Sequence, residues 1–342
     1  MAVAEELRPG ARTDPARRAL ASPTLRLAGR RVLAAIPVLW GVTFLTYVVM
    51  NLLPGDTAQI LLGANATPAE IHQLSVELHL NEPFWVRYGN WLAGLFHGSF
   101  GTSLQNGENV TTILGARLPV TAELLLYAFV VSLVLAVGLA VLVARWPNGI
   151  LDRLSLAISM LGLSVAPYVL ALVLVYLVAV TVHWFPALGY TSPSANLVEN
   201  IKSLTLPAVS LGFPLFAVYT RLLRADIVEQ MQREDYIVTA RAKGVRPWRI
   251  LLRHALPNSL FGLITLVGLN LGTLIGATAI IEPIFSLPGA GDILVQSINA
   301  HDVPVIEGIV VVFAVVVVVA NLLADILYAA LDPRIRYGRV AT

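Results

Sequence analysis

The sequence of 342 residues contains no cysteine and very little charge. Without cysteine, the chain can form no disulfide, no thiolate zinc site and no cysteine-ligated iron–sulfur cluster. Charged residues make up only 13% of the chain, whereas about a quarter is usual for a soluble protein. So little charge cannot cover a water-exposed surface, and the mean hydropathy is +0.75. We therefore expect much of the surface to face lipid.

Lysine is almost absent, and the chain has only Lys202 and Lys243. A phosphate-binding P-loop needs a lysine directly after a glycine, and neither lysine follows one. The sequence also lacks the His-Glu-x-x-His pattern of zinc hydrolases. The histidines of the predicted external segments are scattered, except for the loosely spaced His72 and His79. We therefore predict no catalytic residues, no metal site, no nucleic-acid partner and no cofactor bound by this chain.

Six long apolar runs predict six membrane-spanning helices. A helix needs about 20 apolar residues to cross the hydrocarbon core, and a charge at its centre costs about 2.5–3.5 kcal/mol. The third run contains Pro167, and the fourth contains Pro207 and Pro214, which are candidate kinks. The predicted fold class is an all-α integral membrane protein whose spans cover residues 32–53, 118–144, 154–182, 203–220, 259–281 and 308–330.

Arginine and lysine set the orientation, because they accumulate on the cytoplasmic side of membrane proteins. With the N-terminus inside, 20 of the 23 basic residues fall in cytoplasmic segments, and only Arg87, Arg117 and Lys202 fall elsewhere. Both termini are thus predicted to be cytoplasmic. The predicted organisation is a disordered N-terminal tail (1–29), a first span (30–53), an extracytoplasmic cap (54–117), a core of five spans (118–330) with a cytoplasmic loop (221–257), and a C-terminal tail (331–342).

The predicted cap contains one clear helix start. Thr67-Pro68-Ala69-Glu70 places a proline in the first helical position and an acid in the first turn. Such a cap can dock an external partner or act as a lid over the helix bundle, and the sequence leaves both open.

The cytoplasmic loop carries the strongest local signal. Residues 235–244 read as a short helix with acids first and bases last, which suits the helix dipole, and Gly244 stands where a helix end favours a left-handed residue. Arg246-Pro247-Trp248 predicts a second helix, with proline in its first turn, that continues into the fifth span. A short helix held between two spans can transmit force sideways. An ordinary basic loop is the alternative.

These residues resemble a known loop signature. Ala240, Gly244 and Leu256-Pro257 are similar to the Glu-Ala-Ala-x3-Gly…Ile-x-Leu-Pro loop of binding-protein-dependent ABC importers, although Val238, Thr239 and His254 depart from it. The peptide-permease branch of that family has Asp-Tyr-Ile-x-Thr-Ala-Arg-Ala-Lys-Gly, as here. Further segments resemble that branch, and they comprise residues 53–56, 97–103, 118–124, 321–325 and 328–334. The resemblance covers residues 30–338. Importers of the dipeptide, oligopeptide and nickel group have two permease subunits, and this chain resembles the first of them.

The resemblance implies a type I ABC importer permease fold in a bacterial cytoplasmic membrane. It implies a complex with a second homologous permease, two ATPase subunits that bind ATP and magnesium, and an external substrate-binding protein. It implies peptide import by alternating access, with nickel, haem, glutathione or glycosides as alternative cargo. A secondary carrier or channel is a remote alternative, because such proteins more often carry acids or bases in mid-span and these spans are nearly free of them. The residues implied in ATPase coupling are Asp235, Tyr236, Thr239, Ala240, Arg241, Ala242, Lys243, Gly244, Leu256 and Pro257.

A second set of candidates lies in the last two spans. Gly268, Gly272 and Gly276 recur every four residues, a spacing that lets helices approach closely in lipid. Tight packing is one interpretation of this face. A lining of the transport pathway, with Asn270 and Thr273 as polar groups, is the other. Asn321 and Asp325 of the last span lie one helical turn apart and are further candidates for the pathway or for helix packing. Acidic side chains near predicted span ends are expected to reach water in structural roles, and they comprise Glu123, Glu282, Glu307 and Asp325.

Overall fold

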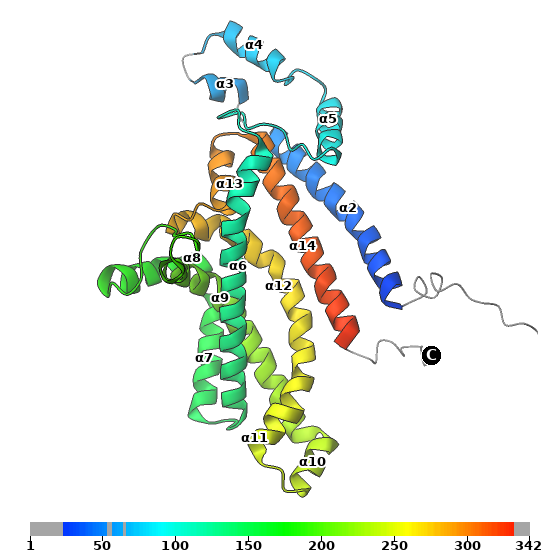
Figure 1. The fold of residues 1–342 in the computed structure, drawn as a ribbon, viewed down its shortest axis with the longest axis vertical. Helices are drawn as coiled ribbons and strands as arrows, with labels where there is room; N and C mark the ends of the chain where they lie inside the picture. Colours follow the sequence, from blue (N-terminus) through cyan, green and yellow to red (C-terminus); the bar gives the residue numbers. More distant parts are fainter. Residues whose placement is uncertain (1–22, 53–56, 64–65, 332–342) are drawn as a thin grey trace, which may run out of the picture.

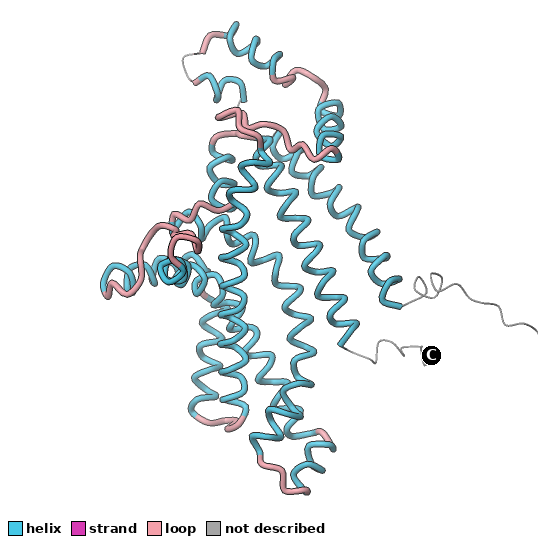
Figure 2. Tube along the Cα trace, viewed as in Figure 1, coloured by secondary structure: helices cyan, strands magenta, loops and turns pink. Residues whose placement is uncertain are grey.

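The computed structural model describes residues 23–52, 57–63 and 66–331 (Figure 1). Within these ranges the chain is helix and loop, and the isolated bridge between Thr102 and Asn109 is the only strand-like pairing (Figure 2). The all-α prediction is confirmed. The helices are α2 (Pro23–Leu52), α3 (Thr57–Leu62), α4 (Pro68–Glu77), α5 (Phe84–Phe96), α6 (Val110–Ala144), α7 (Ile150–Ser164), α8 (Pro167–Leu174), the π-helix η1 (Val175–Thr181), α9 (Leu197–Arg233), α10 (Asp235–Ala242), α11 (Pro247–Ile250), the π-helix η2 (Leu251–Ala255), α12 (Leu256–Phe285), α13 (Ala290–Asn299) and α14 (Val303–Leu331).

Four described helices are long and apolar enough to cross a membrane, namely α2, α6, α9 and α14. Two further pairs pass the same test together but are sharply bent. The first joins α7 to α8 and η1 at 108°, and the second joins the end of α12 to α13 at 81°. The count reaches the predicted six if each bent pair is one span.

The third predicted span, 154–182, differs most from the structure. Instead of one helix with a kink, α7 ends at Ser164 and α8 starts at Pro167. Val165 and Ala166 are extended between them, with ψ of 124° and 140°. A proline disfavours the helical conformation in the residue before it, which explains why the first helix cannot continue.

The fourth predicted span, 203–220, is only the middle of a longer helix. Asn196 caps α9, because its side chain accepts bonds from the amides of Val198 and Glu199, and the helix continues through both internal prolines to Arg233. Residues 221–233, predicted as the start of the cytoplasmic loop, are therefore helical. The predicted loop is reduced to α10, α11 and η2.

The other boundaries shift by smaller amounts. Helix α6 begins at Val110 rather than 118, so the external segment is shorter than predicted, and it is largely helical. Helix α2 begins at Pro23, inside the predicted disordered tail. Residues 1–22, 53–56 and 332–342, which include two of the motif segments in whole or in part, lie outside the described residues.

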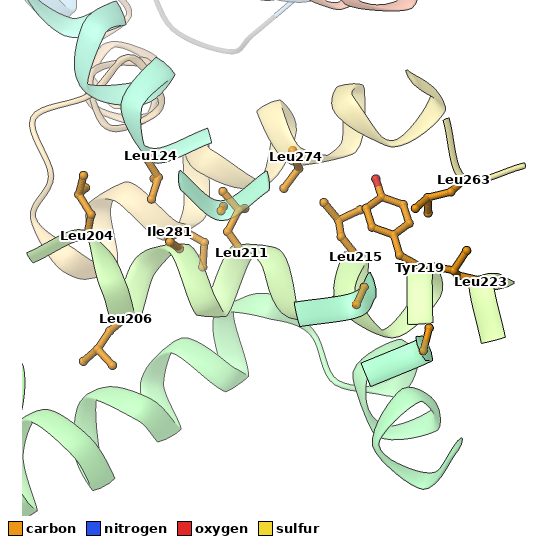
Figure 3. Close-up of a cluster of buried hydrophobic side chains, with 14 of the residues drawn as sticks. Leu124, Leu204, Leu206, Leu211, Leu215, Tyr219, Leu223, Leu263, Leu274 and Ile281 are labelled. Carbon is orange, nitrogen blue, oxygen red and sulfur yellow. The ribbon is translucent and has the colours of Figure 1, made fainter. Parts of the chain in front are cut away.

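The core lies where α6, α9 and α12 meet (Figure 3). Leu124 of α6, Leu211 of α9 and Ile281 of α12 are fully or almost fully buried there. Small residues permit the close approach of α6 and α9, since a Cβ on Gly212 would lie 2.8 Å from the carbonyl oxygen of Ala128. This packed core holds the two ends of the bundle in a fixed relation. The cap helices α3, α4 and α5 lie at one end, and α10 and α11 lie at the other (Figure 1).

Candidate functional site

Helix α10 ends in a complete Schellman motif, as the sequence predicted for Gly244. The Gly244 amide donates to the Arg241 carbonyl at 2.9 Å, and the Val245 amide donates to the Ala240 carbonyl at 3.1 Å. Gly244 has φ of +75°, the left-handed conformation that L-residues disfavour. The turn direction after α10 is thus fixed by backbone geometry.

Both neighbouring long helices hold α10 through side-chain bonds. Arg241 donates to the Met231 carbonyl of α9 at 2.7 Å. The Tyr236 hydroxyl donates to the Gln230 side chain of α9 and accepts from Asn258 of α12 at 2.9 Å. On its inner face, Ile237 is fully buried and Ala240 nearly so. Helix α10 is therefore a rigid bridge between α9 and α12.

The return to α12 is a continuous helical segment from Pro247 onwards. Arg246 is the N-cap residue of α11, and its backbone is extended, with ψ of 138°. Pro247 occupies the first helical position, as predicted. The π-helix η2 continues directly into α12, which begins with Leu256 and Pro257. Ile250 and Leu251 are fully buried. From α11 onwards, a displacement would therefore pass into α12 without a break in the helix.

A second set of contacts ties this end of the bundle to α7. Arg224 of α9 makes a bidentate pair with the buried Asp152 of α7, with donor–acceptor distances of 2.8 and 2.6 Å, and the Asn148 amide also donates to Asp152. Trp146 and Trp248 meet edge to face with centroids 6.2 Å apart. No pattern in the sequence pairs Arg224 with Asp152 or Trp146 with Trp248, because the partners lie far apart along the chain.

The outer face of α10 is open to solvent. Of the ten predicted coupling residues, eight lie on α10 or its cap, and only Ala240 among those eight is buried. Leu256 is half-buried and Pro257 exposed at the start of α12. Val238 is 57% exposed although apolar, and Tyr236 and Trp248 are also exposed. An exposed, mixed apolar and basic surface on a rigid helix is suited to contact with another protein.

The predicted glycine face of α12 packs against another helix at Gly272 but not at Gly276. A Cβ on Gly272 would lie 3.5 Å from Val317 of α14, so Gly272 packs against α14. A Cβ on Gly276 would meet no atom within 4 Å. Asn270 and Thr273 bond to carbonyls of their own helix at 2.8 and 2.7 Å. Gly268 is helical and Asn321 half-buried on α14, but the surroundings of Gly268 and the side chain of Asp325 lie outside the described residues.

Two carboxyl groups that we expected to reach water are buried. Glu282 has no exposed surface. It accepts from the Thr121 hydroxyl at 2.7 Å and from the Asp292 amide at 3.0 Å, and it thereby caps the first turn of α13. Thr121 in turn accepts from the Ala290 amide. Glu307, near the start of α14, is 3% exposed. The prediction of water contact is wrong for both, because they lie in the enclosed junction between the bundle and its outer loops.

The cap is anchored to the outer end of the spans. Tyr88 of α5 and Thr43 of α2 share a hydrogen bond of 3.0 Å, and Tyr47 of α2 packs against Tyr88. Asp302, just before α14, accepts from the Ser103 hydroxyl and from the Leu104 amide. Ser103 belongs to the motif at 97–103. The helix start at Thr67 is confirmed, since Thr67 and Glu70 form a reciprocal capping box. Helix α5 and the segment around Ser103 are thus fixed to the ends of α2 and α14.

Within the described ranges, no group of three or more histidine, aspartate or glutamate side chains gathers closely enough to hold a metal ion.

Comparison with known proteins identifies the family. Residues 132–337 match the model of the binding-protein-dependent transport system inner membrane component, and residues 24–125 match the model of its N-terminal region. A Brucella abortus protein assigned to peptide transport as a permease is 39% identical over 90% of this chain and 98% of its own length. The dipeptide transport system permease protein of Alkalihalophilus pseudofirmus is 36% identical over 92% of this chain and 100% of its own. The glutathione transport system permease protein of Pectobacterium atrosepticum is 34% identical over 90% and 98%. The chain therefore belongs to the family of inner-membrane permease components of binding-protein-dependent transport systems.

Proposed function

We propose that the chain is one of two homologous permease subunits of an importer that moves peptides across the cytoplasmic membrane. Two separate subunits bind ATP and magnesium, and an extracytoplasmic binding protein delivers the cargo. Membership of the family supports a multi-subunit complex. The relatives named for peptide, dipeptide and glutathione transport support the cargo class, since all three names denote peptides or a peptide-like molecule and the alignments span nearly whole chains.

The observation that carries the proposal is the rigid, exposed helix α10 fixed to both α9 and α12. We assign it to docking on an ATPase subunit. When the ATPases close, α10 moves as a body, because the Schellman turn at Gly244 and the buried Ile237 leave it no internal hinge. The bonds of Arg241 to α9 and of Tyr236 to Asn258 then transmit that displacement to two long helices at once.

The core converts this displacement into a change of access. Helices α6, α9 and α12 share one buried cluster, so a push on the α10 end tilts them together. The open side of α12 around Thr273 and Gly276 faces away from the packed core. We assign that side to the pathway or to the second permease, and Gly272 to packing on α14.

Single-cysteine crosslinking tests this assignment, and the chain has no native cysteine to remove. Val238→Cys on α10 and Val76→Cys on α4 are a matched pair, because these valines are 57% and 54% exposed. In membranes that hold the whole complex, we expect Val238→Cys to crosslink to an ATPase subunit and Val76→Cys to the binding protein. A crosslink from Val238→Cys to the binding protein would contradict the orientation and the role of α10.

A further inference from the structure

A pocket of about 330 Å³ lies at the end of the bundle where α10 is placed, between the last turns of α6 and α9 and the start of α11 (Figure 1). Its lining includes Ala144 and Arg145 at the end of α6, Met231 of α9, Arg241 of α10 and Pro247 of α11. This volume is at the lower limit of pockets that hold small molecules. The pocket can therefore receive one compact chemical group.

Among the described residues, two arginines and no acid line this pocket. Arg241 is exposed and donates to the Met231 carbonyl at 2.7 Å, and that bond occupies only one of the five N–H donors of its guanidinium. Arg145 is half-buried, with its guanidinium 5.4 Å from the centre of the Trp146 ring. The Nε atom of Arg145 is enclosed, so its terminal nitrogens are the donors that can reach a ligand.

The acids of the neighbouring turns do not offset these two charges. Glu229 of α9 and Asp152 of α7 are each paired with another arginine of α9, and Asp226 faces α12. The acids at 234–235 stand at the start of α10, whereas Arg241 lies in its last turn. Two like charges at one pocket repel each other, and an anion between them would remove that cost. The lining therefore favours an anionic ligand.

The pocket lies at the level where α6 leaves the hydrocarbon core of the membrane. Residues 124–144 of α6 carry no charge, and at 1.5 Å per residue they extend about 30 Å, which is the thickness of that core. Arg145 is the first charge after this stretch. Trp146 and Ile150, on either side of the lining residue Pro147, are 51% and 79% exposed. Tryptophan is enriched at the membrane–water interface, so the pocket lies at the level of the lipid head groups.

We propose that this pocket binds the phosphate group of an anionic phospholipid from the inner leaflet. Arg145 and Arg241 donate to the phosphate oxygens, since basic pockets at the cytoplasmic ends of spans suit anionic head groups. An acidic side chain of a docked protein would match the two charges but not the exposed apolar surface of Trp146 and Ile150. A phospholipid matches both. The inference goes beyond the proposed function, because it adds a lipid that joins the end of α6 to α10.

The test uses the complete complex in phosphatidylcholine nanodiscs that contain a small fraction of phosphatidylglycerol with a photoreactive diazirine in its head group. After illumination, mass spectrometry of peptides would map the adducts. We expect adducts on the residues that line the pocket. Unlabelled phosphatidylglycerol should compete with them, whereas added phosphatidylcholine or glycerol phosphate should not. The glycerol phosphate arm distinguishes a soluble phosphate compound from a lipid.

Arg145→Gln should lower the adduct yield in the pocket about fivefold, the factor expected for one arginine near an anionic surface. Arg249→Gln is the matched control, because Arg249 is an exposed arginine of α11 outside the lining, and it should keep the native yield. An equal fall in both variants would reduce the effect to overall charge and would overturn the specific role of the pocket.

Two outcomes with the native chain would also overturn the inference, and neither depends on whether a variant folds. The first is competition by glycerol phosphate as strong as that by phosphatidylglycerol, which would assign the pocket to a soluble anion. The second is the absence of adducts in the pocket, which is the result expected if an acidic segment of an ATPase subunit fills it instead.

Discussion

Substitution of Gly244 by valine should uncouple ATP hydrolysis from transport while leaving the fold intact. A Cβ at this position would meet no atom within 4 Å, so the effect comes from the backbone and not from a clash. Holding an L-residue in the left-handed conformation costs about 1–2 kcal/mol. A free-energy change of that size lowers the relative population of the native turn roughly 5–30-fold. The turn lies outside the α6–α9–α12 core, so membrane insertion should be unaffected.

Gly98 provides the matched control. It ends α5 in the cap with the same Schellman bonds and φ of +77°, and a Cβ there would also meet no atom within 4 Å, so Gly98→Val introduces the same strain at the opposite end. Gly244→Asn is the rescue variant, because asparagine tolerates the left-handed conformation better than valine. The assay is peptide uptake per ATP hydrolysed in proteoliposomes that hold the complete complex.

We expect uptake per ATP to fall several-fold in Gly244→Val, to recover in Gly244→Asn and to stay at the native value in Gly98→Val. An unchanged ratio in Gly244→Val would refute the coupling role of the turn. An equal fall in both valine variants would show that strain anywhere in the chain has this effect, and it would refute the specific role of α10.

Three further predictions follow from other contacts. Asp152→Asn should lower the thermal stability of the detergent-solubilised complex, because removing one partner of a buried ion pair costs about 3–5 kcal/mol; a melting curve equal to the native one would show that the pair with Arg224 contributes nothing. Single cysteines at Thr102 and Lys243 should react with a membrane-impermeant maleimide from outside and from inside respectively, and labelling from the same side would contradict the topology. Bonds from Thr67 hold the pKa of Glu70 below its ordinary value, so the amides of α4 should keep their hydrogen-exchange protection above that ordinary value and lose it as the pH falls through the lowered pKa; Glu70→Gln should remove this pH dependence, and a transition that persists in it would assign the effect to another group.

Local signals in the sequence predicted the local structure well. The order of acids and bases, the glycine at 244 and the proline at 247 gave α10, its turn and the start of α11 close to the observed bounds. Thr67 and Glu70 gave the start of α4. Each of these features depends on residues within a few positions of one another. Such features can be deduced from one sequence because the interacting groups are neighbours along the chain.

Contacts between distant segments could not be deduced in this way. The burial of Glu282 depends on Thr121, and the burial of Asp302 on Ser103, which are far apart in the sequence. The bend before Pro167 is also larger than the kink that the sequence predicted. Proline predicts an interruption, but the size of the 108° angle also reflects the packing of α8 against α9 and α12. Hydropathy therefore predicted the apolar runs but not their paths through the bundle.

The central claim is that this chain works as a permease within an ATP-driven complex, and purification from the native membrane tests it most directly. The tagged chain would be extracted in a mild detergent, and the chains that co-purify with it would be identified and quantified. The account predicts one copy of a second, homologous permease and two ATP-binding subunits for each tagged chain. A tagged chain that emerges alone, or only with copies of itself, would contradict the account.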